Sequence, residues 1–212
     1  MKTAIIDSGI DLKYIEFNDK NIEISDADYR DENGHGTACV SEFFLVNPKG
    51  FVTVYKIYDD NNKCSLFSMV NVLERIADRD DISIISISGA FDTDDDEIIE
   101  YTQEIINKLY KKNILVIASE MNGKQKKGYP ACLKHVLAVK KIKFPIRLMV
   151  HYKERAIFFG KDNWVPKTNG EYIRFDGNSS AAPRVSAYYS KCVGMCCVEK
   201  IFDSFEVIFR GI

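Results

Sequence analysis

Several features that define special classes of protein are missing from this 212-residue chain. Its formal net charge is only −2, without a dominant basic region, which argues against nucleic acid as a partner. No apolar run approaches the roughly 18 residues that a membrane-spanning helix needs, so we expect no membrane association. Internal repeats, low-complexity tracts and linkers are also missing. With 46% hydrophobic and 28% charged residues, the composition predicts a single domain over residues 1–212.

An export signal is missing too, which bears on location and on the cysteines. The first strand-like run starts at Met1, which leaves no room before Asp7 for a signal peptide. We therefore expect a cytoplasmic protein whose six cysteines are reduced. A thiolate metal site is one interpretation of Cys192, Cys196 and Cys197, which fall on one expected helix. Packing as small buried side chains is favoured, because no His or Cys-x-x-Cys motif accompanies them, and we expect no metal and no cofactor.

Strand-like and helix-like segments alternate along the chain, as a doubly wound α/β fold requires. Asp94, Asp95 and Asp96 come where one helix opens, and the electrostatics of a helix N-terminus explains them better than a metal site does. We expect a mostly parallel central sheet with helices on both faces. The predicted strands are 1–6, 51–58, 82–87, 114–118, 136–140 and 147–150, and the predicted helices are 38–46, 66–77, 94–112 and a last one that begins near 183.

Three short segments, far apart in the chain, carry Asp, His and Ser in that order. Asp7 falls where the first strand ends, His35 lies between two glycines at a helix start, and Ser179 precedes a helix start rich in small residues. Strand ends and helix N-termini are where functional groups of α/β proteins gather. Each segment alone reads as an ordinary turn, loop or helix cap. Together, in this order, they indicate the triad of a serine protease.

These segments resemble the boxes of the subtilisin-like serine proteases, or subtilases: Asp-Ser-Gly, His-Gly-Thr and Gly-Thr-Ser-Met-Ala-x-Pro, with Asn178 and Ser180 in place of the usual Thr and Met. Residues 84–89 resemble the family's substrate-binding strand, and residues 129–139 its Tyr-Pro-Ala…Val-x-Ala-Val stretch. The resemblance covers roughly residues 3–195. It implies a subtilisin-like fold and a serine endopeptidase, in which Ser179 attacks the peptide carbonyl, His35 transfers the proton and Asp7 orients the imidazole.

The resemblance also implies an oxyanion hole and a substrate site. An ungapped comparison with the family pattern Ala-Ala-Ala-Gly-Asn makes Asn122 the oxyanion donor, with Met121 in place of the usual Gly. Met121 would be strained if the loop needs a positive φ there. A peptide or polypeptide substrate would lie as an added extended strand, with Gly128 near the bottom of the pocket for the residue before the cleaved bond. The implied substrate contacts are Ser86, Ser88, Gly89, Ser119, Glu120 and Gly128.

Two questions about function stay open at this point. Lys124, Lys126 and Lys127 either favour an acidic substrate side chain or are merely solvated. The chain is either an active intracellular endopeptidase that processes proteins or peptides, or a catalytically weak peptide-binding or regulatory module on the same fold. The intact triad favours the enzyme, whereas Met121 and the missing pro-segment favour the module.

Overall fold

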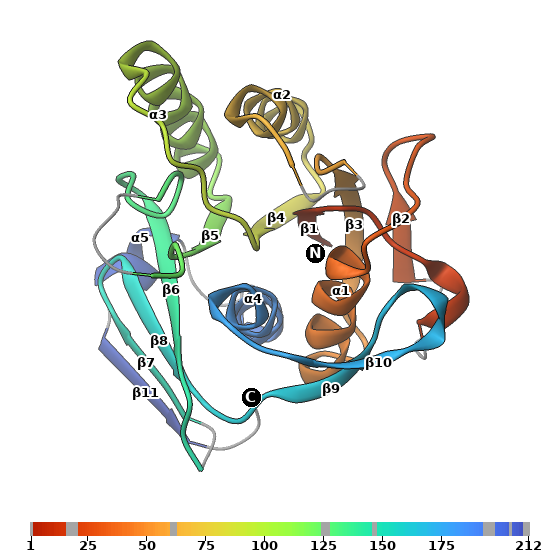
Figure 1. The fold of residues 1–212 in the computed structure, drawn as a ribbon. Coiled ribbons are helices and arrows are strands. Elements are labelled where there is room, and N and C mark those ends of the chain that lie inside the picture. Colours follow the sequence, from red (N-terminus) through yellow and green to blue (C-terminus); the bar gives the residue numbers. More distant parts are fainter. Residues whose placement is uncertain are drawn as a thin grey trace.

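The computed structural model describes residues 2–15, 21–59, 63–123, 128–145, 148–192, 198–203 and 205–209 (Figure 1). The strands are β1 (Lys2–Asp7), β2 (Ile22–Ile24), β3 (Phe51–Lys56), β4 (Ile82–Ile87), β5 (Leu115–Ser119), β6 (Val136–Ile142), β7 (Leu148–Tyr152), β8 (Arg155–Phe159), β9 (Asn163–Pro166), β10 (Tyr172–Phe175) and β11 (Phe205–Phe209). The α-helices are α1 (His35–Val46), α2 (Leu66–Ala77), α3 (Asp96–Lys111), α4 (Ala181–Cys192) and α5 (Val198–Asp203). Short 3₁₀ turns are η1 (Leu12–Tyr14), η3 (Thr168–Gly170) and η4 (Asn178–Ser180).

Nine of the described strands form one mostly parallel sheet, in the order β11-β7-β8-β6-β5-β4-β1-β3-β2. Every neighbouring pair from β8 to β2 is parallel, whereas β7 is antiparallel to both β8 and β11. A separate antiparallel hairpin is made of β9 and β10. Because parallel strands end at the same edge, the residues that follow β1, β4 and β5 lie near one another at the carboxyl edge of the sheet.

Helices cover both faces of this sheet (Figure 1). Successive side chains of β1 point to opposite faces of the sheet. Ile5 packs in an apolar cluster with α1 and α4, whereas Ala4 and Ile6 pack in a second apolar cluster with α2 and α3. The same alternation in the other central strands makes them apolar on both faces, which is typical of parallel sheets. The predicted doubly wound α/β fold is therefore confirmed.

The acidic run before α3 lies where a helix N-terminus was expected. Asp95 is the N-cap residue, and its carboxylate accepts hydrogen bonds from the backbone N–H groups of Glu97 and Ile98, at 3.1 and 3.3 Å. Asp96 and Glu97 occupy the first turn, where the positive end of the helix dipole favours negative charge. The electrostatic interpretation of this run accounts for its position.

The helix predicted to carry three cysteines is described as α4 up to Cys192. Cys196 and Cys197 lie outside the described residues, so their place on the same helix stays a prediction. Among the described residues, Cys39, Cys64 and Cys132 are not joined in disulfides. Over the same residues, no helix combines the length and the apolar character that a bilayer crossing requires.

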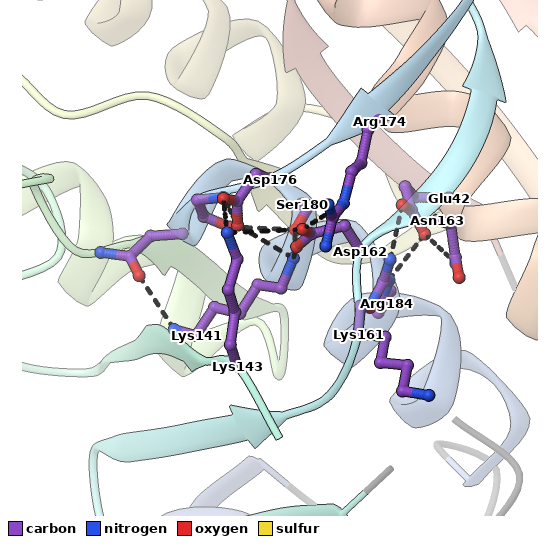
Figure 2. Close-up of polar contacts among 12 residues, drawn as sticks. Glu42, Lys141, Lys143, Lys161, Asp162, Asn163, Arg174, Asp176, Ser180 and Arg184 are labelled. Atoms are coloured by element: carbon purple, nitrogen blue, oxygen red, sulfur yellow. Dashed lines mark hydrogen bonds and ion pairs between the residues drawn. The ribbon is translucent and has the colours of Figure 1, made fainter. Parts of the chain in front are cut away.

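A buried ion pair joins α1 to α4 (Figure 2). Arg184 donates from Nε and Nη2 to the two carboxylate oxygens of Glu42, both at 2.6 Å, and the two side chains are 1% and 0% exposed. Asn163 of β9 donates to the same carboxylate at 2.9 Å, and Arg184 donates to the Lys161 carbonyl oxygen at 3.2 Å. These additional hydrogen bonds offset the cost of burying both charges. The pair fixes how the two helices lie against each other.

Arg184→Met should lower the free energy of unfolding by about 3–5 kcal/mol, because it leaves the Glu42 carboxylate buried without its partner. Urea unfolding measures the change. Lys108→Met is the matched control: it removes an exposed ion pair with Asp78 and should cost less than about 1 kcal/mol. Glu42→Leu combined with Arg184→Met should recover most of the loss, since both charges are then gone. A loss from Arg184→Met no larger than that of the control would contradict this account.

Candidate active site

Asp7 lies at the carboxyl end of β1 and is wholly buried. Its Oδ1 accepts the Ser8 backbone N–H at 2.8 Å and lies 2.7 Å from Nδ1 of His35. Its Oδ2 accepts the Cys39 thiol at 3.4 Å. Burial works to raise the pKa of Asp7, but the charge of His35 and the hydrogen bonds from His35 and Ser8 lower it below its ordinary value. The buried group is therefore a carboxylate at neutral pH.

The start of α1 is anchored by Asp31, a buried residue that is not among those predicted from the sequence. Its Oδ1 accepts the Gly34 N–H and the Ser8 hydroxyl, each at 2.8 Å, and its Oδ2 accepts the N–H and the hydroxyl of Thr37 at 2.7 and 2.6 Å. A carboxylate here also meets the positive end of the helix dipole. The signal available in the sequence was an Asp four residues before His35, at an expected helix start.

His35, the first residue of α1, presents one ring edge to Asp7 and packs on Phe175 with ring centroids 5.3 Å apart. Burial works to lower the pKa of His35, but the charge and the hydrogen bond of Asp7 outweigh it, with a contribution from Asp31. The pKa is therefore raised above its ordinary value of 6.5. The imidazole can take up a proton and hold it near neutral pH.

Ser179 lies on η4, directly before α4, and is partly exposed. Within the described residues, its hydroxyl donates to the carbonyl oxygen of Ser88 at 3.0 Å and is not hydrogen-bonded to His35. The backbone carbonyl oxygen of Ser179 lies 4.0 Å from Sγ of Cys39, and that sulfur lies 3.8 Å from Nδ1 of His35. The structure thus brings Asp7, His35 and Ser179 together around one buried thiol.

Asn122 lies against the turn that carries Ser179. Its Oδ1 accepts the backbone N–H of Asn178 at 3.3 Å, and its side-chain amide lies beside Gly177. The left-handed conformation in this loop falls at Gly123, with φ of 108°, so the strain considered for Met121 does not arise. In the described part of the chain, the residues other than glycine with positive φ are Asn113, His135, Lys153 and Asn169.

Four of the expected substrate contacts lie at the adjacent ends of β4 and β5. The side chains of Ser86 and Ser119 belong to the sheet interior, since these residues are 0% and 2% exposed. Ser88 is also buried and reaches the site through its carbonyl oxygen. Glu120 is partly exposed and forms an ion pair with Arg155 at 3.2 Å. Of the four, Glu120 alone has a side chain that solvent reaches appreciably.

The two expected glycines lie close to this edge. Gly89 follows Ser88 and is partly exposed, whereas Gly128 is buried. A Cβ at Gly128 would lie 2.9 Å from Cβ of Met121 and 3.2 Å from Cβ of Ala90, so only glycine fits there without displacing a neighbour. The three lysines of residues 124–127 lie outside the described residues.

Asp7, His35 and Cys39 also form a group of potential metal ligands, with their ligand atoms within 4.8 Å of one another. Burial, and then the charge of Asp7, raise the pKa of the Cys39 thiol well above its ordinary value of 9.0. The thiol donates a hydrogen bond to Asp7. The Asp7–His35 hydrogen bond explains the cluster, so we assign no metal to it.

Comparison with known proteins agrees with this architecture, which is that of a subtilisin-like α/β protein. The model of the subtilase family matches residues 1–192, and the chain belongs to this family of serine proteases. Among curated protein sequences, none matches the chain significantly.

Solved structures share the fold over nearly the whole chain. The prenylagaramide maturation protease PagA has a TM-score of 0.78 and is 22% identical, covering 96% of this chain and 78% of its own. A lanthipeptide protease has a TM-score of 0.71 at 19% identity, with 95% and 78% covered. Sphericase has a TM-score of 0.78 at 18% identity, with 95% and 80% covered. At these identities the likeness establishes the fold, and the chemistry rests on this chain's own residues.

Asp7→Asn should lower the pKa of His35 below 6.5, because the ring stays buried while the charge that offsets burial is removed. An NMR titration of the imidazole measures this pKa. His135, whose pKa is lowered mainly by burial, is the internal control and should titrate as in the parent. An unchanged pKa of His35 would show that Asp7 does not set it.

The same two groups give folding stability a definite pH dependence. The pKa of His35 is raised in the folded state. Its contribution to the free energy of unfolding is therefore fully present below the pKa of the unfolded state and is lost as pH rises through the pKa of the folded state. The pKa of Asp7 is lowered in the folded state. Its contribution to the free energy of unfolding is therefore fully present above the pKa of the unfolded state and is lost as pH falls through the pKa of the folded state. The pair therefore contributes most between the unfolded pKa of Asp7 and that of His35.

Proposed function

We propose that this chain is a serine endopeptidase whose catalytic residues are Asp7, His35 and Ser179. The observation that carries the proposal is the contact between an ionised, buried carboxylate and an imidazole of raised pKa, with 2.7 Å between Oδ1 and Nδ1. A serine at a helix N-terminus lies at the same edge of the sheet. A base held by a carboxylate beside a serine hydroxyl is what nucleophilic catalysis requires.

In the proposed reaction, Ser179 Oγ attacks the carbonyl carbon of the scissile bond and Nε2 of His35 takes the hydroxyl proton. Asp7 keeps the other ring proton on Nδ1 and stabilises the positive imidazolium that forms. When the tetrahedral intermediate collapses, His35 gives its proton to the leaving amine, and an acyl-enzyme remains. A water molecule, deprotonated by His35, then releases the acyl group and restores Ser179.

The negative oxygen of that intermediate needs donors that are already in place. We assign the Asn122 side-chain amide and the Ser179 backbone N–H to this role. The position of Asn122 beside Gly177 and Asn178 supports the assignment, as does the positive end of the dipole of α4, which starts two residues after Ser179.

The proposed substrate is a peptide that lies as an extended strand beside residues 86–89 and 119–121. Two proteins of similar structure are a prenylagaramide maturation protease and a lanthipeptide protease, which supports peptide processing as the role to test. Digestion of an unbiased peptide library and of precursor peptides by the purified chain defines the preference.

A second candidate is a peptide-binding module that cleaves poorly. It is favoured by the Ser179 hydroxyl, which donates to the Ser88 carbonyl rather than to His35. Labelling with a fluorophosphonate probe separates the two candidates, because only an activated serine reacts quickly. Binding of peptide without labelling or cleavage would establish the module.

Ser179→Ala should abolish fluorophosphonate labelling, whereas Ser180→Ala should still be labelled. Ser180 is fully buried, and its hydroxyl is engaged with the Gly177 carbonyl oxygen and with Lys141, so it is not available for attack. Mass spectrometry of the labelled peptide identifies the modified serine. Labelling that persists in Ser179→Ala and disappears in Ser180→Ala would reverse the assignment.

Asn122→Ala should lower kcat roughly 10²–10³-fold, which is the loss measured when subtilisin loses its oxyanion-hole asparagine. KM and unfolding free energy should change little, because the amide acts on charge that appears only in the transition state. Steady-state kinetics on one cleaved peptide provides both constants. Parent-like turnover by Asn122→Ala, with Ser179→Ala inactive, would mean that another donor fills the hole.

A further inference from the structure

A group of charges built around one buried ion pair, which the proposed reaction does not use, lies next to the Ser179 turn (Figure 2). We call it the lysine cluster: Lys141, Lys143, Asp162, Arg174 and Asp176. The side chains of Lys141 and Asp162 are 2% and 1% exposed, and Nζ lies 2.5 Å from Oδ1. The other Asp162 oxygen meets Arg174 at 2.9 Å and Lys143 at 3.5 Å, while Asp176 pairs with Lys143 at 2.5 Å and with Lys141 at 3.4 Å. Three cations face two carboxylates, which leaves one positive charge in excess.

Lys141 is buried at a position where an apolar side chain would be expected, and its apolar neighbour is exposed. In β6, Lys141 points inward, and the following residue, Ile142, is 37% exposed. A buried ion pair is often no more stabilising than a well-packed apolar residue of similar size. Stability alone therefore does not explain a buried lysine here.

Lys141 holds the turn on both sides of Ser179. Its Nζ donates to the Ser180 hydroxyl at 3.0 Å, and that hydroxyl donates to the Gly177 carbonyl oxygen at 3.0 Å. Its backbone N–H donates to Oδ1 of Asn178 at 2.9 Å. The residues immediately before and after Ser179 are thus both fixed to β6 through one lysine.

We propose that Lys141 is a positioning residue for Ser179, which it holds through Ser180 and Asn178 in the place that attack on a peptide carbonyl requires. The inference rests on the proposed function. A displacement of about 1 Å at a reacting atom can cost a factor of 10² in rate, so a rigid turn has kinetic value.

Lys141 acts here as a donor and not as a base. Its Nζ donates to the Ser180 hydroxyl, whose own proton is donated to the Gly177 carbonyl oxygen, and an ammonium group accepts no hydrogen bond. It therefore does not take the Ser180 proton, and Lys141 and Ser180 do not form a second nucleophilic pair.

The test compares Lys141→Met, Ser180→Ala and the double variant with the parent. Each single variant should lower kcat roughly 10- to 100-fold with KM nearly unchanged, and the rate of fluorophosphonate labelling of Ser179 should fall in parallel. The loss of kcat in the double variant should be no greater than the larger of the two single losses, since both substitutions break the same contact between Lys141 and Ser180. Lys108→Met makes the same chemical change at an exposed lysine and should keep the parent kcat.

The measurements distinguish a positioning role of Lys141 from a purely structural one. A purely structural role would lower the melting temperature and leave kcat of the folded protein unchanged, which would overturn the proposal. Fully additive losses in the double variant would also overturn it. If Lys141→Met does not fold, Ser180→Ala decides alone, because it removes one oxygen atom, and parent-like kcat and labelling would then refute the inference. A parent that neither cleaves nor labels would instead refute the proposed function, and this inference with it.

Discussion

The ion pair between Glu42 and Arg184 is the contact on which the geometry of the candidate site most depends. It joins the helix that begins at His35 to the helix that follows Ser179, and both helices pack on the same face of the sheet. Apolar packing alone tolerates small shifts of one helix along another. A bidentate pair between a guanidinium and a carboxylate has one good geometry, so it fixes the register of the two helices. The distance between a histidine and a serine brought from opposite ends of the chain is thereby set.

Three sets of buried charged groups lie on the elements that carry the site. Asp31 fixes the start of α1, the Glu42–Arg184 pair fixes α1 against α4, and the lysine cluster fixes the turn before α4. Each costs desolvation, and hydrogen bonds and ion pairs within each group offset that cost. Two apolar clusters already pack the helices on the sheet, so these polar contacts are best understood as the means of holding a few atoms in place.

Much of the fold and part of the site could be predicted from the sequence, because both leave local signals. Apolar runs and helical spacing predicted the central strands and α1 to α4, and three short motifs predicted Asp7, His35 and Ser179; their catalytic roles stay a prediction. The short strands β2, β8, β9, β10 and β11 and the six-residue α5 leave little periodicity, so they were not predicted. Lys141 could not be found in this way. A lysine beside another lysine is ordinarily solvated, and its burial depends on Asp162 and Asp176, which are distant in the sequence.

Two departures of this chain from the subtilase pattern, Asn178 and Ser180, are linked through Lys141. The three structures compared above share only 18% to 22% of their residues with this chain, so the fold tolerates most replacements as long as the apolar pattern is kept. At the turn that carries Ser179, the replacements are chemically linked. Ser180 stands where the family usually has Met and supplies the acceptor for Lys141, while Asn178, in place of Thr, ties the turn to the main chain of β6 and to the Glu120 carbonyl oxygen. A thioether accepts hydrogen bonds only weakly, so a methionine at position 180 would leave the ammonium of Lys141 with fewer partners. Ser180 and Lys141 are therefore best understood as a matched pair, each of which makes the other tolerable in a buried place.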